Sequence, residues 1–327
     1  MTTLRRASGG ELGAVAVIVA IVATLVIAMA AFALDTGDLW QSRRNLIVGT
    51  DAAALAAAEI YASNGNGCAG TPSTYMAKND PDGSVTGCSF TSLGPAAGYV
   101  TVDGERTVDY TFAGVFGLES HDVQSTTTAA YGQPNGLRGL RPLGLCADSP
   151  ELGAWMASGM STPFTTTITY GKNAPDDCGA NVPGNWGVLD FDGGANSSND
   201  TKNWIEFGYP GLVTAPGTSP GDPGAFSNSL GSALNTLKTS GEVFQLPIYD
   251  SASGNGSNAV FHLVGFVSVR LLDYDANGPE ASRWIQVEFR TDVGQGTCCA
   301  HGTDLGTRVV FICAVDKPFA PANCADR

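Results

Sequence analysis

An uncharged apolar run near the N-terminus constrains this chain more than any other feature. Between Leu12 and Leu34 no residue carries a charge, and 12 of the 23 residues are Leu, Ile, Val or Phe. As a helix the run would be about 35 Å long, slightly more than the ~30 Å hydrocarbon core of a bilayer. An ionisable group at the bilayer centre would oppose insertion by roughly 2.5–3.5 kcal/mol, and the run contains none. We therefore predict a transmembrane helix over residues 12–34, preceded by a cytoplasmic leader over residues 1–11.

A cleaved signal peptide is the alternative interpretation of this run. Ala31-Phe32-Ala33 has the small residues that precede a cleavage site. The apolar part of a signal peptide usually spans only about 7–15 residues, so the length of the run favours a retained helix. No second run of this kind follows, and we expect a single-pass protein.

Charge divides the chain into two parts. The 327 residues carry a formal net charge of -14. Residues 1–50 hold four basic and three acidic side chains, whereas residues 51–327 hold 13 basic and 28 acidic ones. Phosphate binding requires a basic surface, so we expect no nucleic-acid partner. Hydrophobic residues make up 43% of the chain and charged residues 15%, which excludes a disordered acidic tail and a long coiled coil.

Cysteine usage predicts the compartment of the large acidic part. All eight cysteines follow the apolar run, and their even number favours disulfides in an oxidising environment. Basic residues on the two sides of the run nearly balance, so the cysteines decide the orientation: N-terminus inside the cytoplasmic membrane, C-terminal body outside. Adjacent cysteines strain the geometry of a bridge, so we expect no bond within the Cys-Cys pair. The expected bridges are Cys68–Cys88, Cys146–Cys178, and two that link the adjacent Cys298 and Cys299 to Cys313 and Cys324.

A second helix-forming stretch, residues 35–63, follows the apolar run directly. Apolar and small residues recur there at intervals of three, four and seven, which places them on one helical face. Small residues let another backbone approach closely, so we predict a packing seam rather than an alanine-rich surface helix. We expect Asp35 or Thr36 to cap this helix and residues 64–67 to end it. The predicted face consists of Leu39, Leu46, Thr50, Ala53, Ala57 and Ile60, and the bulky residues that need cover are Trp40, Leu46, Ile47 and Ile60.

Residues 9–62 resemble a known family. They combine Gly9-Gly10, the apolar run, Asp35-x-Gly37, Arg43-Arg44-x-Leu46 and Thr50-Asp51-Ala52-Ala53-Ala54-Leu55. This combination resembles the N-terminal domain of TadE/TadG-like proteins, which are membrane-anchored components of bacterial Flp (tight adherence) pilus-assembly systems. The resemblance implies a pilin-like subunit or assembly factor that contacts other pilus proteins outside the cytoplasmic membrane and is not an enzyme. Segments 184–194 and 264–272 look like parts of large actinobacterial Tad-like proteins.

The leader departs from the pattern of pilin-type precursors. Those precursors are cut after a glycine and usually carry glutamate at the fifth mature position. A cut after Gly10 would make Glu11 the first residue and Val15 the fifth. Whether the N-terminus is processed therefore stays open.

We predict an α+β fold in which the long helix is followed by an antiparallel, β-rich body. Residues 64–139 should form a small pilin-like β unit, and residues 140–327 a β-rich, disulfide-containing extracytoplasmic domain. Within residues 64–139, Thr/Val-rich runs predict strands at residues 99–103, 108–111 and 123–130, with a helical turn at residues 112–117.

Alternation of apolar and polar residues predicts the central strands of the domain over residues 140–327. From Phe261 to Leu271 the odd positions are apolar or glycine, which indicates one buried and one wet face. This strand should pair with residues 285–289 across a turn at residues 273–282. Further candidates are a strand at residues 308–315 and short helices at residues 151–159 and 225–238.

A search for catalytic patterns finds none that satisfies its structural context. The three histidines, His121, His262 and His301, lack a second histidine at metal-ligand spacing, so we expect them to be solvated. Gly217-Thr-Ser-Pro-Gly221 matches a nucleophile elbow, but its prolines forbid the helix that must follow, and we interpret it as a loop. We predict no catalytic residue and no cofactor.

Two oxygen-rich turns are the calcium candidates. Asp273-Tyr-Asp275-Ala-Asn277-Gly278 reproduces the first half of an EF-hand loop, although Trp284 stands where a bidentate carboxylate is needed. Asp190 and Asp192 lie in the second turn. The alternative is that Asp, Asn and Gly simply form turns between strands.

The leading hypothesis is a membrane-anchored structural or assembly component of a Flp pilus that acts through protein–protein contacts. The small-residue helix face is also a candidate contact for a homo-oligomer. One alternative is a membrane-tethered extracytoplasmic hydrolase. Another is a calcium- or glycan-dependent surface binder that uses Trp186, Trp204 or Trp284 as a platform, although tryptophans of this kind are more typical of a core.

Overall fold

A computed structural model describes most of the chain. The described residues are 11–63, 65–160, 163–170, 178, 187–193, 198–222, 226, 228–277, 283–299 and 303–313. They belong to two compact units, each described here by itself. The first unit consists of Met1–Ala53, Gly70–Cys88 and Thr101–Thr127, and the second of Ala54–Ala69, Ser89–Val100 and Thr128–Arg327.

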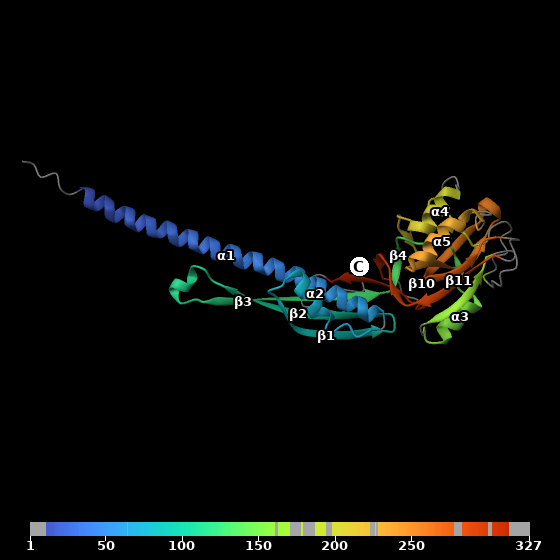
Figure 1. The fold of residues 1–327 in the computed structure, drawn as a ribbon, viewed down its shortest axis with the longest axis horizontal. Coiled ribbons are helices and arrows are strands. Elements are labelled where there is room, and N and C mark those ends of the chain that lie inside the picture. The colour runs from blue at the N-terminus through green and yellow to red at the C-terminus, as the bar shows by residue number, and fades with distance from the viewer. Residues whose placement is uncertain are drawn as a thin grey trace, which may run out of the picture. The chain divides into compact units, whose positions relative to one another are not determined.

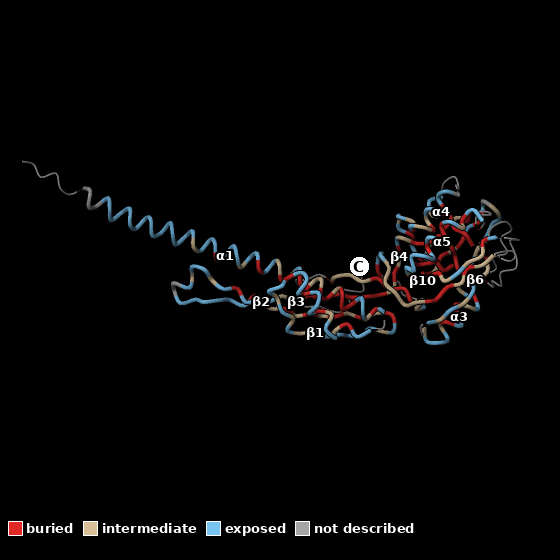
Figure 2. Tube along the Cα trace, viewed as in Figure 1, coloured by how far each residue is buried: buried red, intermediate tan, exposed pale blue. Residues whose placement is uncertain are grey.

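One helix, α1, contains both the apolar run and the small-residue stretch that follows it. It runs without a break over Glu11–Ala62, a total of 52 residues (Figure 1). Apolar side chains of its first half are exposed, whereas its second half contains a run of buried positions (Figure 2). The expected continuation of the apolar helix into a long second stretch is confirmed, and so is its end before Gly65–Gly67. The expected cap at Asp35 or Thr36 is wrong, because the helix does not start there.

A five-stranded sheet follows α1 in the order β1-β2-β3-β14-β12. The predicted strands at residues 99–103 and 108–111 are one strand, β2, which ends at Asp109. Predicted residues 123–130 lie within β3, and the turn at residues 112–117 contains the 3-10 helix η1. The strand β1 and the helix α2 were not predicted from the sequence. The bounds are α2 Thr71–Asn79, β1 Ser84–Gly94, β2 Ala97–Asp109, η1 Ala113–Phe116, β3 Ser120–Gly132, β12 Asp292–Val293 and β14 Thr307–Ile312.

A six-stranded sheet in the order β5-β9-β10-β11-β6, with β8 paired to β10, forms the centre of the second unit. The predicted hairpin is confirmed, because β10 and β11 are antiparallel with Asp275 opposite Trp284. Predicted residues 151–159 and 225–238 correspond to α3 and, in part, to η2 and α5, whereas α4 was not predicted. The bounds are β5 Leu145–Cys146, α3 Pro150–Ala157, β6 Phe164–Thr169, α4 Ser198–Phe207, β8 Gly217–Pro220, η2 Asn228–Leu230, α5 Gly231–Ser240, β9 Val243–Ser253, η3 Gly256–Asn258, β10 Val260–Asp275 and β11 Trp284–Arg290.

A small third sheet has the order β13-β4-β7, with bounds β4 Pro134–Leu137, β7 Val213–Thr214 and β13 Gly296–Cys298. The third predicted strand, residues 308–315, corresponds to β14. It pairs with β3, so that Val309 lies opposite Gly132 and Ile312 opposite Ala129. Long-range pairing of this kind leaves no local signal in the sequence.

The alternation along β10 is confirmed on one face only. Phe261, Leu263, Val267 and Val269 are buried as predicted. The other face is not wholly wet, since Ser268 is also fully buried and its hydroxyl lies 2.9 Å from that of Thr307.

Each unit has its own core. In the first unit Leu46 packs with Met76, Val108 and Val123. In the second unit two larger clusters surround the six-stranded sheet. Their largest fully buried side chains include Trp155, Phe226, Phe261, Phe266 and Phe289.

The disulfides agree with the prediction in part. Cys68–Cys88 and Cys146–Cys178 are bridged as expected, the latter with its Cα atoms 5.9 Å apart. Cys298 and Cys299, however, bridge each other, so the expectation that they reach Cys313 and Cys324 is wrong. The peptide bond between the two is cis and their Cα atoms are 3.0 Å apart. Cys313 is also disulfide-bonded, and Cys324 lies outside the described residues.

Candidate functional site

The site that the sequence singles out is the second half of α1, where the small-residue face is buried. Within the first unit we call Ser42, Leu46, Gly49, Thr50 and Ala53 the helix seam, and all five are buried. Farther along the same helix, in the second unit, Ala54, Ala57, Ala58 and Ala62 are buried as well. The predicted packing seam is confirmed at Leu46, Thr50, Ala53 and Ala57, but not at Ile60, which is exposed.

Two glycines set how closely the elements approach the helix seam. A β-carbon on Gly104 of β2 would lie 2.6 Å from Thr50 Cγ2 and 2.8 Å from Met76 Cε. A β-carbon on Gly49 would lie 2.5 Å from Met76 Sδ. These distances are shorter than any normal carbon contact, so α1, α2 and β2 pack closely because both positions lack a side chain.

Thr50 and Asp51 bind β3 through a buried hydroxyl network. Thr50 Oγ1 donates to the Leu46 or Ile47 carbonyl, each at 3.0 Å, and lies 3.0 Å from Ser125 Oγ. The Thr127 hydroxyl contacts Asp51 Oδ1 at 2.7 Å and Thr50 Oγ1 at 3.1 Å. The Thr-Asp pair of the sequence motif therefore provides the polar contacts between α1 and the sheet.

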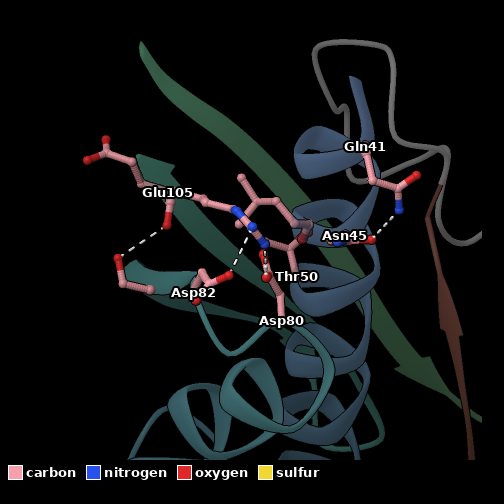
Figure 3. Close-up of polar contacts among 9 residues, drawn as sticks. Gln41, Asn45, Thr50, Asp80, Asp82 and Glu105 are labelled. Atoms are coloured by element: carbon pink, nitrogen blue, oxygen red, sulfur yellow. Dashed lines mark hydrogen bonds and ion pairs between the residues drawn. The ribbon is translucent and has the colours of Figure 1, made fainter. Parts of the chain in front are cut away.

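A second polar group fixes α2 against β2. The Asp80 carboxylate is almost fully buried and forms an ion pair with Arg106, which also pairs with Asp82 at 2.9 Å. Figure 3 shows Asp80 and Asp82 beside Thr50 of α1, with Gln41 and Asn45 on the same helix nearer its N-terminal end. Sequence analysis did not identify Asp80 or Arg106, because their pairing joins residues 26 positions apart.

Asp35 connects the end of the apolar run to the β2–β3 hairpin. Its buried carboxylate accepts backbone N–H groups from Thr111 at 3.0 Å, Phe112 at 3.1 Å and Ala113 at 2.7 Å. Asp35 thus caps η1 rather than α1, and three N–H donors satisfy a carboxylate that would otherwise be costly to bury.

The opposite face of α1 stays exposed among the described residues. Trp40 is 63% exposed and Val48 50%, and the Arg44 guanidinium lies 5.7 Å from the Trp40 ring centre. Ile60 is exposed too, although it belongs to the predicted seam face near the C-terminal end of the helix. Trp40 and Ile60 are thus not covered within the described residues, whereas Leu46 is buried as predicted and Ile47 is half-buried.

The chain's own contacts already cover most of the small-residue face that was predicted to bind a second copy. Its central residues, Leu46, Thr50 and Ala53, are fully buried within the chain. A second copy could reach them only if the chain's own contacts opened. A homo-oligomer through this face stays a prediction.

The two calcium candidates are engaged in local hydrogen bonds. Asp273 Oδ1 lies 2.8 Å from Lys238 Nζ and accepts the Tyr274 N–H, and Asp275 Oδ1 accepts the Asn277 N–H at 2.8 Å. Asp273 thus already has a cationic partner in Lys238. Over the described residues, His, Cys, Asp and Glu form no group of three or more that could hold a metal.

Asp190 is an unusual acid within its turn. Its Oδ1 accepts the N–H groups of Asp192 and Gly193 at 3.3 and 3.2 Å, the pattern of an Asx turn. Burial raises the pKa of Asp190 to about 6, with a further contribution from the side chain of Asp192. Burial also raises the pKa of Asp222, whose carboxylate accepts the Thr201 hydroxyl at 2.7 Å.

The described histidines do not form a catalytic set. His121 lies exposed on β3, and His301 lies outside the described residues. His262 Nδ1 lies 2.8 Å from Asp250 Oδ1, and Ser251 Oγ donates to the same carboxylate at 2.8 Å. A nucleophilic triad instead places the histidine between the serine and the acid.

Ser219 and the tryptophans have structural surroundings. Ser219 lies in β8 rather than in the loop we expected, and its buried hydroxyl donates to the Asp190 carbonyl at 3.1 Å. Trp204 is half-buried and packs on Phe191 and Tyr209. Trp284 is half-buried in β11, and Trp186 lies outside the described residues.

The second unit also contains a cavity that the sequence did not predict. Its volume is about 780 Å³, and its lining includes Phe266, Leu305, Cys299, Asp148 and Asn135. A mixed lining of this kind gives no specific constellation for catalysis.

Comparison with known proteins identifies the N-terminal segment alone. The family model of Flp pilus-assembly TadE/G-like proteins (Tad) matches residues 13–59. This match covers the apolar half of α1 and the helix seam, the part of the sequence that carries the resemblance stated above. No curated protein and no solved structure matches the chain. The chain thus carries a Tad-type segment on a helix that is long and apolar enough to cross a membrane.

Proposed function

We propose that this protein is a single-pass, membrane-anchored structural or assembly component of a Flp pilus system. The observation that carries the proposal is the coincidence of the Tad match, residues 13–59, with the helix that joins an exposed apolar segment to a buried seam. In this proposal residues 12–34 cross the cytoplasmic membrane with the N-terminus inside, and the sheet-rich body works outside.

The body acts through contacts with other pilus proteins and performs no catalysis. The cysteine bridges support an extracytoplasmic place for it. The exposed face of α1 around Trp40 and Val48 supports a contact role, because exposed aromatic and aliphatic groups on a rigid element are typical of interfaces. The arrangement of Ser251, Asp250 and His262 gives the hydrolase alternative no support.

Deletion and complementation in the native host test this function. We expect deletion to abolish or strongly reduce Flp pili and surface adhesion, and the wild-type chain to restore both. The double variant Trp40→Asp, Val48→Asp should be produced at the wild-type level and stay in the membrane, but it should fail to restore pili. The matched control is Phe207→Asp, which alters an exposed side chain in the second unit. Normal pili and adhesion in the deletion strain would contradict the proposed function.

A further inference from the structure

The tip of the β2–β3 hairpin is an uncharged loop held at a defined level of α1. Residues 111–118 read Thr-Phe-Ala-Gly-Val-Phe-Gly-Leu and contain no charged side chain. The Tyr110 N–H donates to the Glu119 carbonyl at 2.9 Å and closes the hairpin below this loop. Gly117, with a φ of 83°, ends η1 in a conformation that glycine adopts without strain.

Asp35 fixes the position of this tip along the helix. Three consecutive backbone N–H groups of the loop, from Thr111 to Ala113, lie within 3.1 Å of its carboxylate oxygens. Asp35 directly follows Leu34, the last residue of the apolar run. The tip therefore lies at the level where the predicted span ends, and both belong to the first unit. Figure 1 shows the hairpin that carries η1 running beside α1 toward the N-terminal half of that helix.

The tip exposes apolar side chains at this level. Leu118 is 58% exposed and Phe112 37%. Because removing apolar side chains from water is favourable, both would gain free energy from an apolar environment. On α1 the exposed Trp40 lies about 9 Å past Leu34 along the helix axis, within reach of a headgroup layer that is several ångström thick. Tryptophan is enriched at that level in membrane proteins, and the Arg44 guanidinium above its ring suits the same place.

We propose that the β2–β3 tip inserts into the interfacial layer of the membrane's outer leaflet, as a second lipid contact beside the span. Phe112 and Leu118 enter the boundary between headgroups and acyl chains, and Asp35 sets their depth. Asp109 and Glu119 flank the tip with charge and limit how deeply it enters. Because no basic side chain lies in the tip, the insertion depends on apolar contact and not on anionic lipid. The proposal rests on the membrane anchor proposed above, and it assigns the hairpin an additional role.

The test uses the full chain in phosphatidylcholine vesicles, with its native disulfides kept oxidised. A nitroxide label is placed by cysteine substitution at one position at a time, and collisions with oxygen and with a water-soluble nickel chelate are measured. The positions are Leu118→Cys in the tip, Val22→Cys in the span, His121→Cys on β3 just past the tip, and Phe207→Cys in the second unit.

We expect labels at residues 118 and 22 to lose nickel collisions and gain oxygen collisions, whereas labels at residues 121 and 207 stay accessible to nickel. A label at residue 118 as accessible to nickel as that at residue 207, with residue 22 protected, would overturn the tip insertion and leave the anchor standing. Nickel access at both residues 118 and 22 would overturn the anchor itself, and with it the insertion.

Hydroxyl-radical footprinting of the unlabelled wild-type chain gives an independent readout if a cysteine variant fails to fold. In vesicles, oxidation of Phe112 relative to that of Phe207 should be well below the ratio of their exposed fractions, 37% and 72%. A ratio that matches these exposed fractions would overturn the insertion.

Discussion

At the scale of single residues, glycines and small hydroxyls determine how the Tad-type segment folds. Gly104 and Gly49 mark places where α1, α2 and β2 approach closer than any side chain allows. Thr50 and Asp51 then satisfy the polar groups that this approach buries. The motif in the sequence is therefore explained by packing, without any need for catalysis.

Gly104→Ala should destabilise the first unit by about 1–3 kcal/mol, because the added methyl group meets the stiff Thr50 side chain. Gly37→Ala is the control, since a β-carbon on Gly37 would have no atom within 4 Å. Chemical unfolding of the full chain in detergent measures both. Equal stability of the two variants would show that the close approach is not required.

Asp190 should make the stability of the body fall as the pH rises from about 4 to about 6. Its pKa is raised to about 6 in the folded chain, so the folded state keeps a proton that the unfolded state has already released. Asp190→Asn should reduce this fall, which thermal unfolding across the pH range would detect, and the part that remains belongs to acids such as Asp222, whose pKa is also raised by burial.

Asp250→Asn is the matched control for that experiment. The hydrogen bond from His262 lowers the pKa of Asp250, so its ionised form stabilises the fold above its usual pKa and that contribution is lost as the pH falls. Removal of the Asp250 carboxylate should therefore change how stability is lost at acidic pH, below the usual pKa of an aspartate. The decline in stability between pH 4 and 6 should stay intact. An unchanged decline in Asp190→Asn would contradict the assignment of that titration to Asp190.

At the scale of elements, α1 is the feature that could be predicted best. Its apolar run, its continuation and its seam follow from composition and from helical spacing, both of which are local. The exposure of Trp40 could not be predicted, because a bulky residue near such a seam fits equally well beneath a sheet or at a membrane surface. The role of Asp35 was missed for a similar reason, since its partners lie 76–78 residues away.

Thr50→Val should weaken the packing of α1 on β3 by about 1–3 kcal/mol, because it leaves buried hydroxyl partners on β3 and the Leu46 carbonyl with fewer hydrogen bonds. Thr24→Val is the control on the same helix, where the exposed hydroxyl only bonds back to the Ala20 carbonyl. Hydrogen exchange of the β3 amides would report the difference. Equal exchange in both variants would show that the Thr50 network does not hold the helix to the sheet.

At the scale of the whole molecule, the local patterns gave the classes of the elements but not their partners. The β10–β11 hairpin was predictable because its strands are adjacent in sequence. The pairing of β14 with β3 was not, since about 180 residues separate them and loop closure carries no signature in the residues themselves. The vicinal Cys298–Cys299 bridge was not predicted, because adjacent cysteines usually strain the geometry of a bridge.

The central claim is that residues 12–34 hold an extracytoplasmic body in the membrane, and protease treatment of intact spheroplasts tests it most directly. We expect external protease to digest the body while an N-terminal fragment that contains α1's apolar half stays in the membrane pellet after alkaline extraction. Complete protection of the body in intact spheroplasts, or its release from the membrane without protease, would contradict the account.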